Sequence, residues 1–174
     1  DINPSSVLAA NLAQPTFIGG EYVAGNDEES GVTGQAVQIY GGGTPISPMV
    51  FQDATFQSTN KGCGNRDGGR SAIWASQTFI RVQNSDFAGG DFGISIRNSA
   101  GKVTNSTISV TCNGIDVNSL KAIGNTEYDV EISNNVITTT QRTPITAYSG
   151  ADVRIHNNEL AGAGEGSGIA VYSS

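Results

Sequence analysis

The 174-residue sequence has few charged and few aromatic residues. Charged residues make up 14% of the chain and the formal net charge is −7. We therefore expect no nucleic-acid partner, because phosphate binding needs clustered Lys and Arg. No apolar run approaches the roughly 20 residues of a membrane-spanning helix, so we expect no membrane insertion. A polyanionic sugar remains compatible with this composition, because a local basic patch can act against the mean charge.

Histidine and cysteine are also scarce, with one His and two Cys. A single histidine, His156, cannot by itself build a His-based metal site, and we expect neither a metal nor a cofactor. The sequence begins at Asp1 and shows no charged-then-apolar secretion signal, which favours a mature or trimmed product.

Glycine and one repeated phrase are what the sequence does contain. The 23 glycines and 37% hydrophobic content suit many short strands separated by turns. The phrase Val153–Leu160 alternates apolar and polar residues, turns at Asn157, and resumes with one large apolar residue. Related phrases occur at Met49–Phe56, Ile80–Phe87, Val103–Ile108 and Val130–Ile137.

A second apolar phrase precedes these copies and recurs six times. It occurs at Val37–Tyr40, Ile73–Ser76, Ile94–Arg97, Ile115–Asn118, Ile145–Tyr148 and Ile169–Tyr172. The turn residues recur at intervals of roughly 20 to 30 residues, a spacing typical of solenoids. Because strand-like phrases follow one another without a helix between them, the pattern predicts an all-β solenoid of about six coils.

The turn residues suggest how the coils stack. Asn and Asp tolerate left-handed backbone best after Gly, so we expect a sharp corner at Asp53 and at Asn84, Asn105, Asn134 and Asn157. Coils about 4.8 Å apart would let the corner amides hydrogen-bond in a ladder. The only N-glycosylation triplet, Asn105-Ser106-Thr107, contains one of these corners. Because a glycan would break the expected ladder, we interpret the triplet as structural.

The N-terminal segment predicts a short helical cap. Asn3 can cap a helix, Pro4 fits the first helical position, and Ala and Leu residues follow up to Leu12. A disordered leader is the alternative. The predicted organisation is a cap over residues 1–15 and a single solenoid domain over residues 16–174.

The phrases Gly114–Val117, Asn105–Ile108 and Asn134–Ile137 resemble the right-handed parallel β-helix superfamily over about residues 36–172. This superfamily contains pectate-lyase-like proteins, uronan epimerases and carbohydrate-associated repeats. It also contains adhesins, phage spikes and fibres, so the resemblance implies the fold without implying one activity.

One face of the predicted solenoid gathers aromatic residues. The outward positions of the first strand in each coil include the only Trp and three of the five Tyr. Aromatic rings beside polar groups are typical of sugar-binding sites. We therefore predict carbohydrate binding at Tyr40, Trp74, Arg97, Asp116, Asn118, Tyr148 and Tyr172. The alternative is that Tyr and Trp act as ordinary strand formers that shield a sheet.

The same face contains only some of the residues that catalysis on a uronan would need. Uronan lyases and epimerases need a neutralised carboxylate, a base and an acid. The related epimerases carry an Asp-Pro-His-Asp phrase, whereas Gly114–Asn118 retains a single Asp. A minimal catalytic site would consist of Asp116, Arg97, Lys121 and Tyr148.

The two cysteines occupy the same predicted corner. Cys63 lies in a long loop, and Cys112 lies two coils later. That separation, about 9.6 Å, is too long for a direct bond between fixed positions, although the loop can fold toward Cys112. Both a disulfide and free thiols therefore remain open, and a disulfide would favour a secreted protein.

Three functional hypotheses follow. The sequence ends at Val171–Ser174 inside the first strand of a new coil, and we expect that edge to be covered by another molecule or truncated. The first hypothesis is a non-catalytic extracellular or cell-surface structural or attachment module, associated with polysaccharide and self-associating through the open C-terminal coil into filaments. The second is a small polysaccharide lyase or related carbohydrate-active enzyme. The third is a fragment of a trimeric phage or surface spike.

Overall fold

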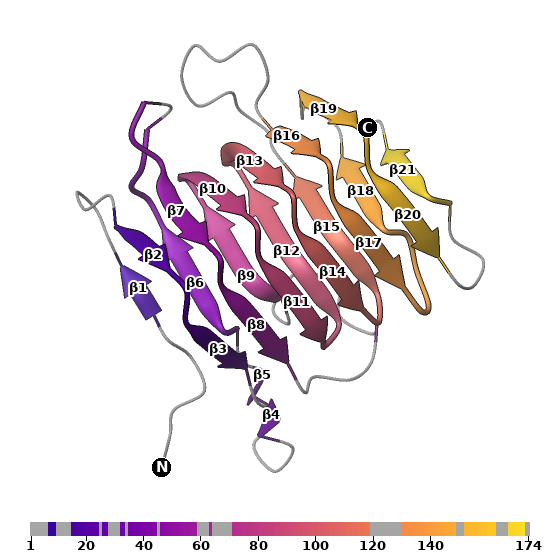
Figure 1. Ribbon diagram of the computed structural model, residues 1–174, viewed down its shortest axis with the longest axis horizontal. Coiled ribbons are helices and arrows are strands. Elements are labelled where there is room, and N and C mark those ends of the chain that lie inside the picture. The colour runs from indigo at the N-terminus through magenta and orange to yellow at the C-terminus, as the bar shows by residue number, and fades with distance from the viewer. Residues whose placement is uncertain are drawn as a thin grey trace.

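The protein forms three parallel β-sheets that wind around one common axis (Figure 1). The computed structural model describes residues 7–9, 15–24, 26–27, 32–33, 35–44, 46–58, 63, 71–118, 130–148, 152–162 and 167–172. Over these residues the secondary structure is entirely β, as the sequence predicts.

The strands are named in chain order and grouped by sheet. The first sheet consists of β1 (Val7–Ala9), β6 (Val37–Tyr40), β9 (Ser71–Ser76), β12 (Phe92–Arg97), β15 (Asn113–Asn118), β18 (Ile145–Tyr148) and β21 (Ile169–Tyr172). The second sheet consists of β2 (Thr16–Ile18), β7 (Met49–Gln52), β10 (Phe79–Gln83), β13 (Ala100–Thr104), β16 (Val130–Ser133) and β19 (Val153–His156). The third sheet consists of β3 (Glu21–Ala24), β8 (Thr55–Ser58), β11 (Asp86–Gly89), β14 (Thr107–Val110), β17 (Val136–Thr139) and β20 (Glu159–Gly162). A short antiparallel pair, β4 (Asn26–Asp27) and β5 (Val32–Thr33), lies outside the three sheets.

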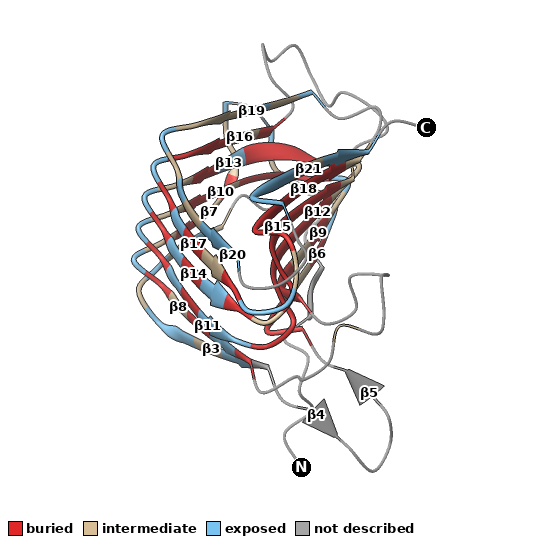
Figure 2. Ribbon diagram, turned by 90° about the vertical axis from the view of Figure 1, so that its right-hand side faces the viewer, coloured by how far each residue is buried: buried red, intermediate tan, exposed pale blue. Residues whose placement is uncertain are grey.

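The chain visits the first, second and third sheets in turn, so each circuit adds one strand to each sheet. Six circuits are followed by β21, which confirms the predicted all-β solenoid of about six coils. Every contact within the three sheets is parallel, because each strand pairs with the equivalent strand of the next coil. Viewed along the axis, the three sheets enclose a continuous buried interior (Figure 2).

The predicted N-terminal helix is wrong where the structure describes it. Val7–Ala9 form strand β1, which pairs in parallel with β6 through Leu8 and Ile39. Helix propensity in a short segment is a weak preference. Pairing instead provides hydrogen-bond partners for the backbone groups of β6. The other residues of the proposed cap, apart from Pro15, lie outside the described ranges.

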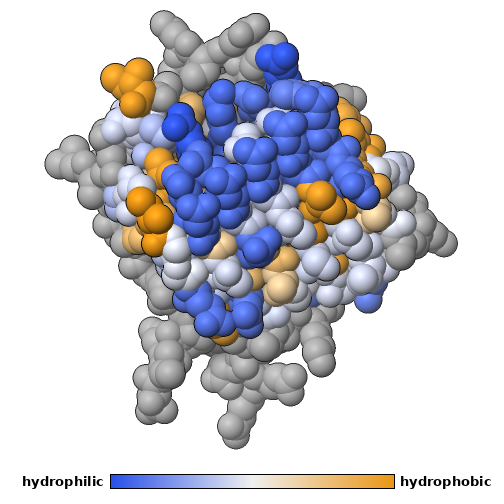
Figure 3. Space-filling model, viewed as in Figure 1, coloured by the Kyte–Doolittle hydropathy of each residue, from blue (hydrophilic) through white to orange (hydrophobic). Residues whose placement is uncertain are grey.

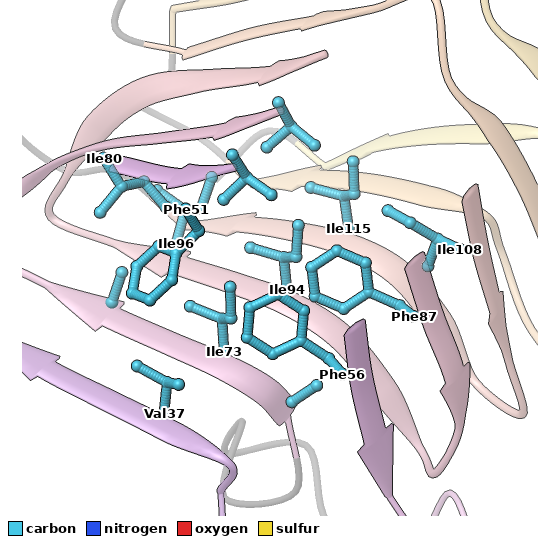
Figure 4. Packing of buried hydrophobic residues seen from close by; sticks show 14 of the residues in the cluster. Val37, Phe51, Phe56, Ile73, Ile80, Phe87, Ile94, Ile96, Ile108 and Ile115 are labelled. Atoms are coloured by element: carbon cyan, nitrogen blue, oxygen red, sulfur yellow. The ribbon is translucent and has the colours of Figure 1, made fainter. Parts of the chain in front are cut away.

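The core is a set of columns in which similar side chains stack, as the sequence predicts. The register places Val82 on Val103 and Phe87 on Ile108, and Ile and Leu continue both columns in the following coils. Phe56 and Phe87 stack with ring centroids 4.5 Å apart (Figure 4). Because the tube is narrow, one large residue per strand position fills it without a wide central core.

The corners between the second and third sheets have left-handed backbone. This conformation occurs at Asp53, Asn84, Asn105, Asn134 and Asn157, with φ between 51° and 56°. The predicted corner residues are therefore confirmed. Their side chains are exposed, in contrast to the expected amide ladder.

The hydrogen-bonded ladder lies one residue further along the chain. The backbone amide of Ser85 donates to Ser106 Oγ at 3.2 Å, and that of Ser106 donates to Asn135 Oδ1 at 3.0 Å. The backbone amide of Asn135 then donates to Asn158 Oδ1 at 2.9 Å. The predicted position of the ladder was wrong because these amides are buried and need an acceptor inside the corner, whereas the left-handed residues lie at the surface.

Candidate functional site

The outer face of the first sheet carries two columns of side chains, which together we call the Tyr40–Tyr172 face. The first column contains Gln38, Trp74, Ser95, Asp116, Thr146 and Ala170. The second contains Tyr40, Ser76, Arg97, Asn118, Tyr148 and Tyr172. The strand register thus places all the described residues of the predicted carbohydrate site on one sheet.

Each end of this face carries an aromatic pair. Tyr40 and Trp74 have ring centroids 4.7 Å apart with a tilt of 59°, and Gln38 Nε2 donates to the Tyr40 hydroxyl at 2.6 Å. At the other end, Tyr148 and Tyr172 stack with centroids 5.2 Å apart. Tyr40 and Tyr172 are 47% and 52% exposed. Four rungs separate Tyr40 from Tyr148, which is roughly 19 Å at the usual strand spacing of ~4.8 Å.

The middle of the face is polar and largely buried. Ser95 and Thr146 are buried, and Asp116 is only 6% exposed. Arg97 is half-buried, and its Nε donates to Ser95 Oγ at 3.4 Å. The sequence placed Asp116 on an outward position but gave no indication of this burial. The face therefore combines one exposed Tyr ring at each end with a buried polar centre.

Asn113, at the start of β15, is a further polar residue near this face that was not among the predicted site residues. Its Nδ2 donates to Thr146 Oγ1 on β18, and its buried Oδ1 has no hydrogen-bond partner within the described residues. The register pairs Phe92 with Asn113 and resumes at Ile94 and Ile115, so it skips the glycine in each strand. In the sequence, Gly114 directly after Asn113 is the feature that could have indicated this break in the strand pairing. Asn113 thus places a buried amide oxygen, without a partner among the described residues, on the side chain that contacts Thr146 of the polar centre.

Asp116 has an altered acidity. Burial raises the pKa of its carboxyl to about 6, and the positive charge of Arg97 opposes this shift. A carboxyl with this pKa changes its protonation state near neutral pH, when it can either donate or accept a hydrogen bond. Of the proposed catalytic set, Arg97, Asp116 and Tyr148 lie on this sheet, and Lys121 lies outside the described residues.

The second sheet presents a different, charged outer face. Lys102 Nζ lies 2.6 Å from Glu131 Oε2, and His156 Nε2 lies 3.4 Å from Glu131 Oε1. The hydrogen bond from Lys102 is the main cause that lowers the Glu131 pKa. Glu131 and Arg154 are adjacent in register on neighbouring coils. Figure 3 shows hydrophilic side chains gathered over this sheet and its corner with the third.

A disulfide joins Cys63 to Cys112, with Cα atoms 5.7 Å apart. Cys112 is fully buried and immediately precedes Asn113, the first residue of β15. The two residues are 49 positions apart in sequence. The disulfide therefore anchors Cys63 at the start of β15, so the alternative of free thiols does not hold.

Comparison with known proteins identifies the family. A family model described as a right handed beta helix region matches residues 23–174, and the chain belongs to this family. Neither the curated proteins nor the solved structures gave a significant match. In the described ranges there is no group of three or more His, Cys, Asp or Glu residues arranged to hold a metal ion. A separate search of the same ranges found no helix long and apolar enough to cross a membrane.

Proposed function

We propose that this protein is a non-catalytic extracellular attachment module that holds an extended saccharide along its Tyr40–Tyr172 face. The observation that carries the proposal is the pair of partly exposed aromatic contacts at the two ends of the Tyr40–Tyr172 face, in which Tyr40 and Tyr172 are exposed and Trp74 and Tyr148 are half-buried. Aromatic rings present flat apolar surfaces that suit the C–H faces of sugars, while their hydroxyl and indole groups remain available for hydrogen bonds. A saccharide that reaches both stacks spans four rungs of the solenoid.

The residues between the stacks suit a hydroxyl-rich ligand. Arg97 and Asn118 are half-buried on adjacent strands, at equivalent positions in the register. A guanidinium donates hydrogen bonds, and an amide both donates and accepts them, so the pair can satisfy several sugar hydroxyls. Their strands lie within a parallel sheet, which limits the conformational entropy lost on binding.

An extracellular location is supported by the disulfide and by the surface composition. Structural disulfides persist mainly in oxidising compartments, and the Cys63–Cys112 bond connects distant parts of the chain. A low content of charged residues, 14% of the sequence, leaves neutral polar groups to solvate much of the surface. These features support an attachment module outside the cytosol.

We propose end-to-end association as the structural part of this function. Strand β21 carries exposed apolar residues, including Val171 at 74% exposure and Ile169. Exposed apolar groups on a strand favour contact with another molecule. Light scattering over a range of concentrations tests the proposal, and Val171→Lys should shift the population toward monomers. A wild-type chain that stays monomeric at every concentration contradicts it.

Affinity electrophoresis through gels containing neutral or acidic polysaccharides tests the saccharide proposal. We expect retardation of the wild-type chain in at least one gel, and weaker retardation of Trp74→Ala and Tyr148→Ala. Gln83→Ala serves as the matched control, because Gln83 is half-buried on the outer face of the second sheet. Equal retardation of all four proteins would place binding elsewhere, and no retardation in any gel would remove the proposal.

Asp116 favours a second candidate function, that of a carbohydrate-active enzyme of the polysaccharide lyase type. Its pKa of about 6 and the neighbouring Arg97 suit proton transfer near neutral pH. An ultraviolet assay for unsaturated uronan products tests this activity. A signal that disappears in Asp116→Asn and in Arg97→Ala would favour the enzyme over the attachment module.

A further inference from the structure

We propose that Asn105 is an N-glycosylation site, modified when the chain passes through a secretory pathway with N-linked glycosylation. Asn105-Ser106-Thr107 is the one triplet in the sequence with the required Asn-x-Ser/Thr pattern. On sequence alone, Asn105 is expected to belong to a hydrogen-bonded ladder that a glycan would break. The structure removes that objection, since the ladder runs through Ser106 instead.

Asn105 lies at the exposed tip of the corner between β13 and β14. Its backbone has a φ of 52°, its side chain is exposed, and its backbone amide donates to Ser133 O on the next coil. The ladder hydrogen bonds involve the backbone and hydroxyl of Ser106, so none of them uses the Asn105 side chain. A group attached to Asn105 Nδ2 therefore extends from the surface without disturbing the stacked coils.

Thr107, the third residue of the triplet, is accessible to a glycosyltransferase. Thr107 is exposed at the start of β14, between Asp86 and Val136 in the neighbouring strands. The other Asn corners do not form the triplet, because the residue two positions after Asn84, Asn134 and Asn157 is Asp, Val and Glu respectively. Thus one corner of this column combines an exposed Asn with the required hydroxyl residue.

The chemistry is a glycosyl transfer from a lipid diphosphate-linked oligosaccharide. Asn105 Nδ2 forms a bond to the anomeric carbon of the first sugar, and the bond from that carbon to the diphosphate oxygen breaks. The lipid diphosphate leaves with the electron pair, and the amide loses one proton. The donor and the transferase come from the host pathway, and the disulfide is the feature of this chain that favours such an oxidising compartment.

The position of Asn105 keeps a glycan away from the proposed saccharide-binding face. The corner between the second and third sheets lies on the opposite side of the tube from the first sheet, as the axial view shows (Figure 2). A glycan at this corner would cover the hydrophilic surface in Figure 3 and would hinder side-by-side contact there. The Tyr40–Tyr172 face would not be covered by the glycan.

The test is secretion of the full chain, with an added leader peptide, from a eukaryotic host that performs N-linked glycosylation. We expect the purified protein to show one mobility shift on denaturing gels that a peptide-N-glycosidase removes. Two variants should abolish the shift without disturbing the fold, because each introduces a residue that already occurs at the equivalent position of another coil. They are Asn105→Asp, which matches Asp53, and Thr107→Val, which matches Val136.

A variant with an added triplet tests whether the transferase glycosylates an Asn at another corner of the same kind. Asp53→Asn completes a second triplet with Ala54 and Thr55 at an equivalent exposed corner, and it should add a second shift of similar size. The glycosylated wild type should resist trypsin as well as the enzymatically deglycosylated protein does. A secreted wild-type chain without the glycosidase-sensitive shift overturns the proposal, whatever the Asp53 variant shows. Glycosylated protein that is unfolded and trypsin-sensitive overturns it equally.

Discussion

The backbone amide of Ser106 donates a hydrogen bond to Asn135 Oδ1 at 3.0 Å, across two adjacent coils. Asn135 is 1% exposed, and its Nδ2 donates to Val103 O at 3.0 Å and to Asn158 Oδ1 at 2.9 Å. One buried amide thus links three consecutive coils at the same corner. Since its donors and acceptors are all satisfied locally, this side chain is a main source of register between coils.

Replacement of Asn135 should therefore be costly. Asn135→Ala leaves the buried Ser106 amide without its acceptor, so we expect the free energy of unfolding to fall by about 1 to 3 kcal/mol. Urea denaturation followed by circular dichroism measures this loss. Asn134→Asp is the control, because Asp53 occupies the equivalent exposed corner, and it should change stability by less than about 0.5 kcal/mol. Equal effects of the two substitutions would contradict the assignment of the ladder.

The disulfide should contribute to global stability. It closes a loop between residues 49 positions apart, and a crosslink of this kind typically stabilises a protein by about 2 to 4 kcal/mol by restricting the unfolded chain. We expect the double variant Cys63→Ser, Cys112→Ser to unfold at a lower urea concentration than the oxidised wild type. Wild-type protein treated with a reductant should behave like the variant. A midpoint that neither treatment changes would show that the bond does not constrain the unfolded state.

The buried carboxyl of Asp116 should make stability depend on pH. Its pKa is about 6 in the folded state, against an ordinary value of 3.8, so the folded state binds this proton more tightly. Stability from this group is therefore present at low pH and decreases as the pH rises from about 4 to about 6. Relative to Asp116→Asn, the wild type should lose on the order of 2 kcal/mol between pH 4 and pH 7. A difference between the two proteins that stays constant over this range would contradict the raised pKa.

Carbon-13 NMR of the Asp116 carboxyl gives an independent measurement of the same group. We expect its chemical shift to titrate near pH 6 in the wild type. In Arg97→Ala the midpoint should move upward, because the Arg97 charge opposes the effect of burial. A midpoint that stays in place in this variant would show that Arg97 does not act on the carboxyl.

The sequence was sufficient to predict the coil architecture, because each coil repeats the same local constraints. Val82, Val103 and Phe87 occur at alternating apolar positions, and the register follows from their placement on one inner face. The left-handed corners follow equally directly from the residue preference for Asn and Asp. These features depend on local patterns that recur in every coil.

Features that depend on contacts between distant parts of the chain could not be predicted from the sequence. The backbone amides that need ladder acceptors are those of Ser85, Ser106 and Asn135, and their burial is not visible from an Asn repeat alone. The burial of Asp116 likewise depends on the packing around an outward-facing strand position. Strand β1 depends on the unpaired edge of β6, which overrides the local preference of Val7–Ala9 for a helix.

The most direct test of the proposed saccharide-binding face is a fluorescence titration of Trp74 with the polysaccharide that retards the protein in gels. The sequence contains one Trp, and its ring lies 4.7 Å from that of Tyr40, so its emission reports on this face alone. We predict a saturable change in emission, with weaker affinity in Tyr148→Ala at the opposite end of the face. Binding of the same polysaccharide without any change in Trp74 emission would contradict the assignment of the Tyr40–Tyr172 face.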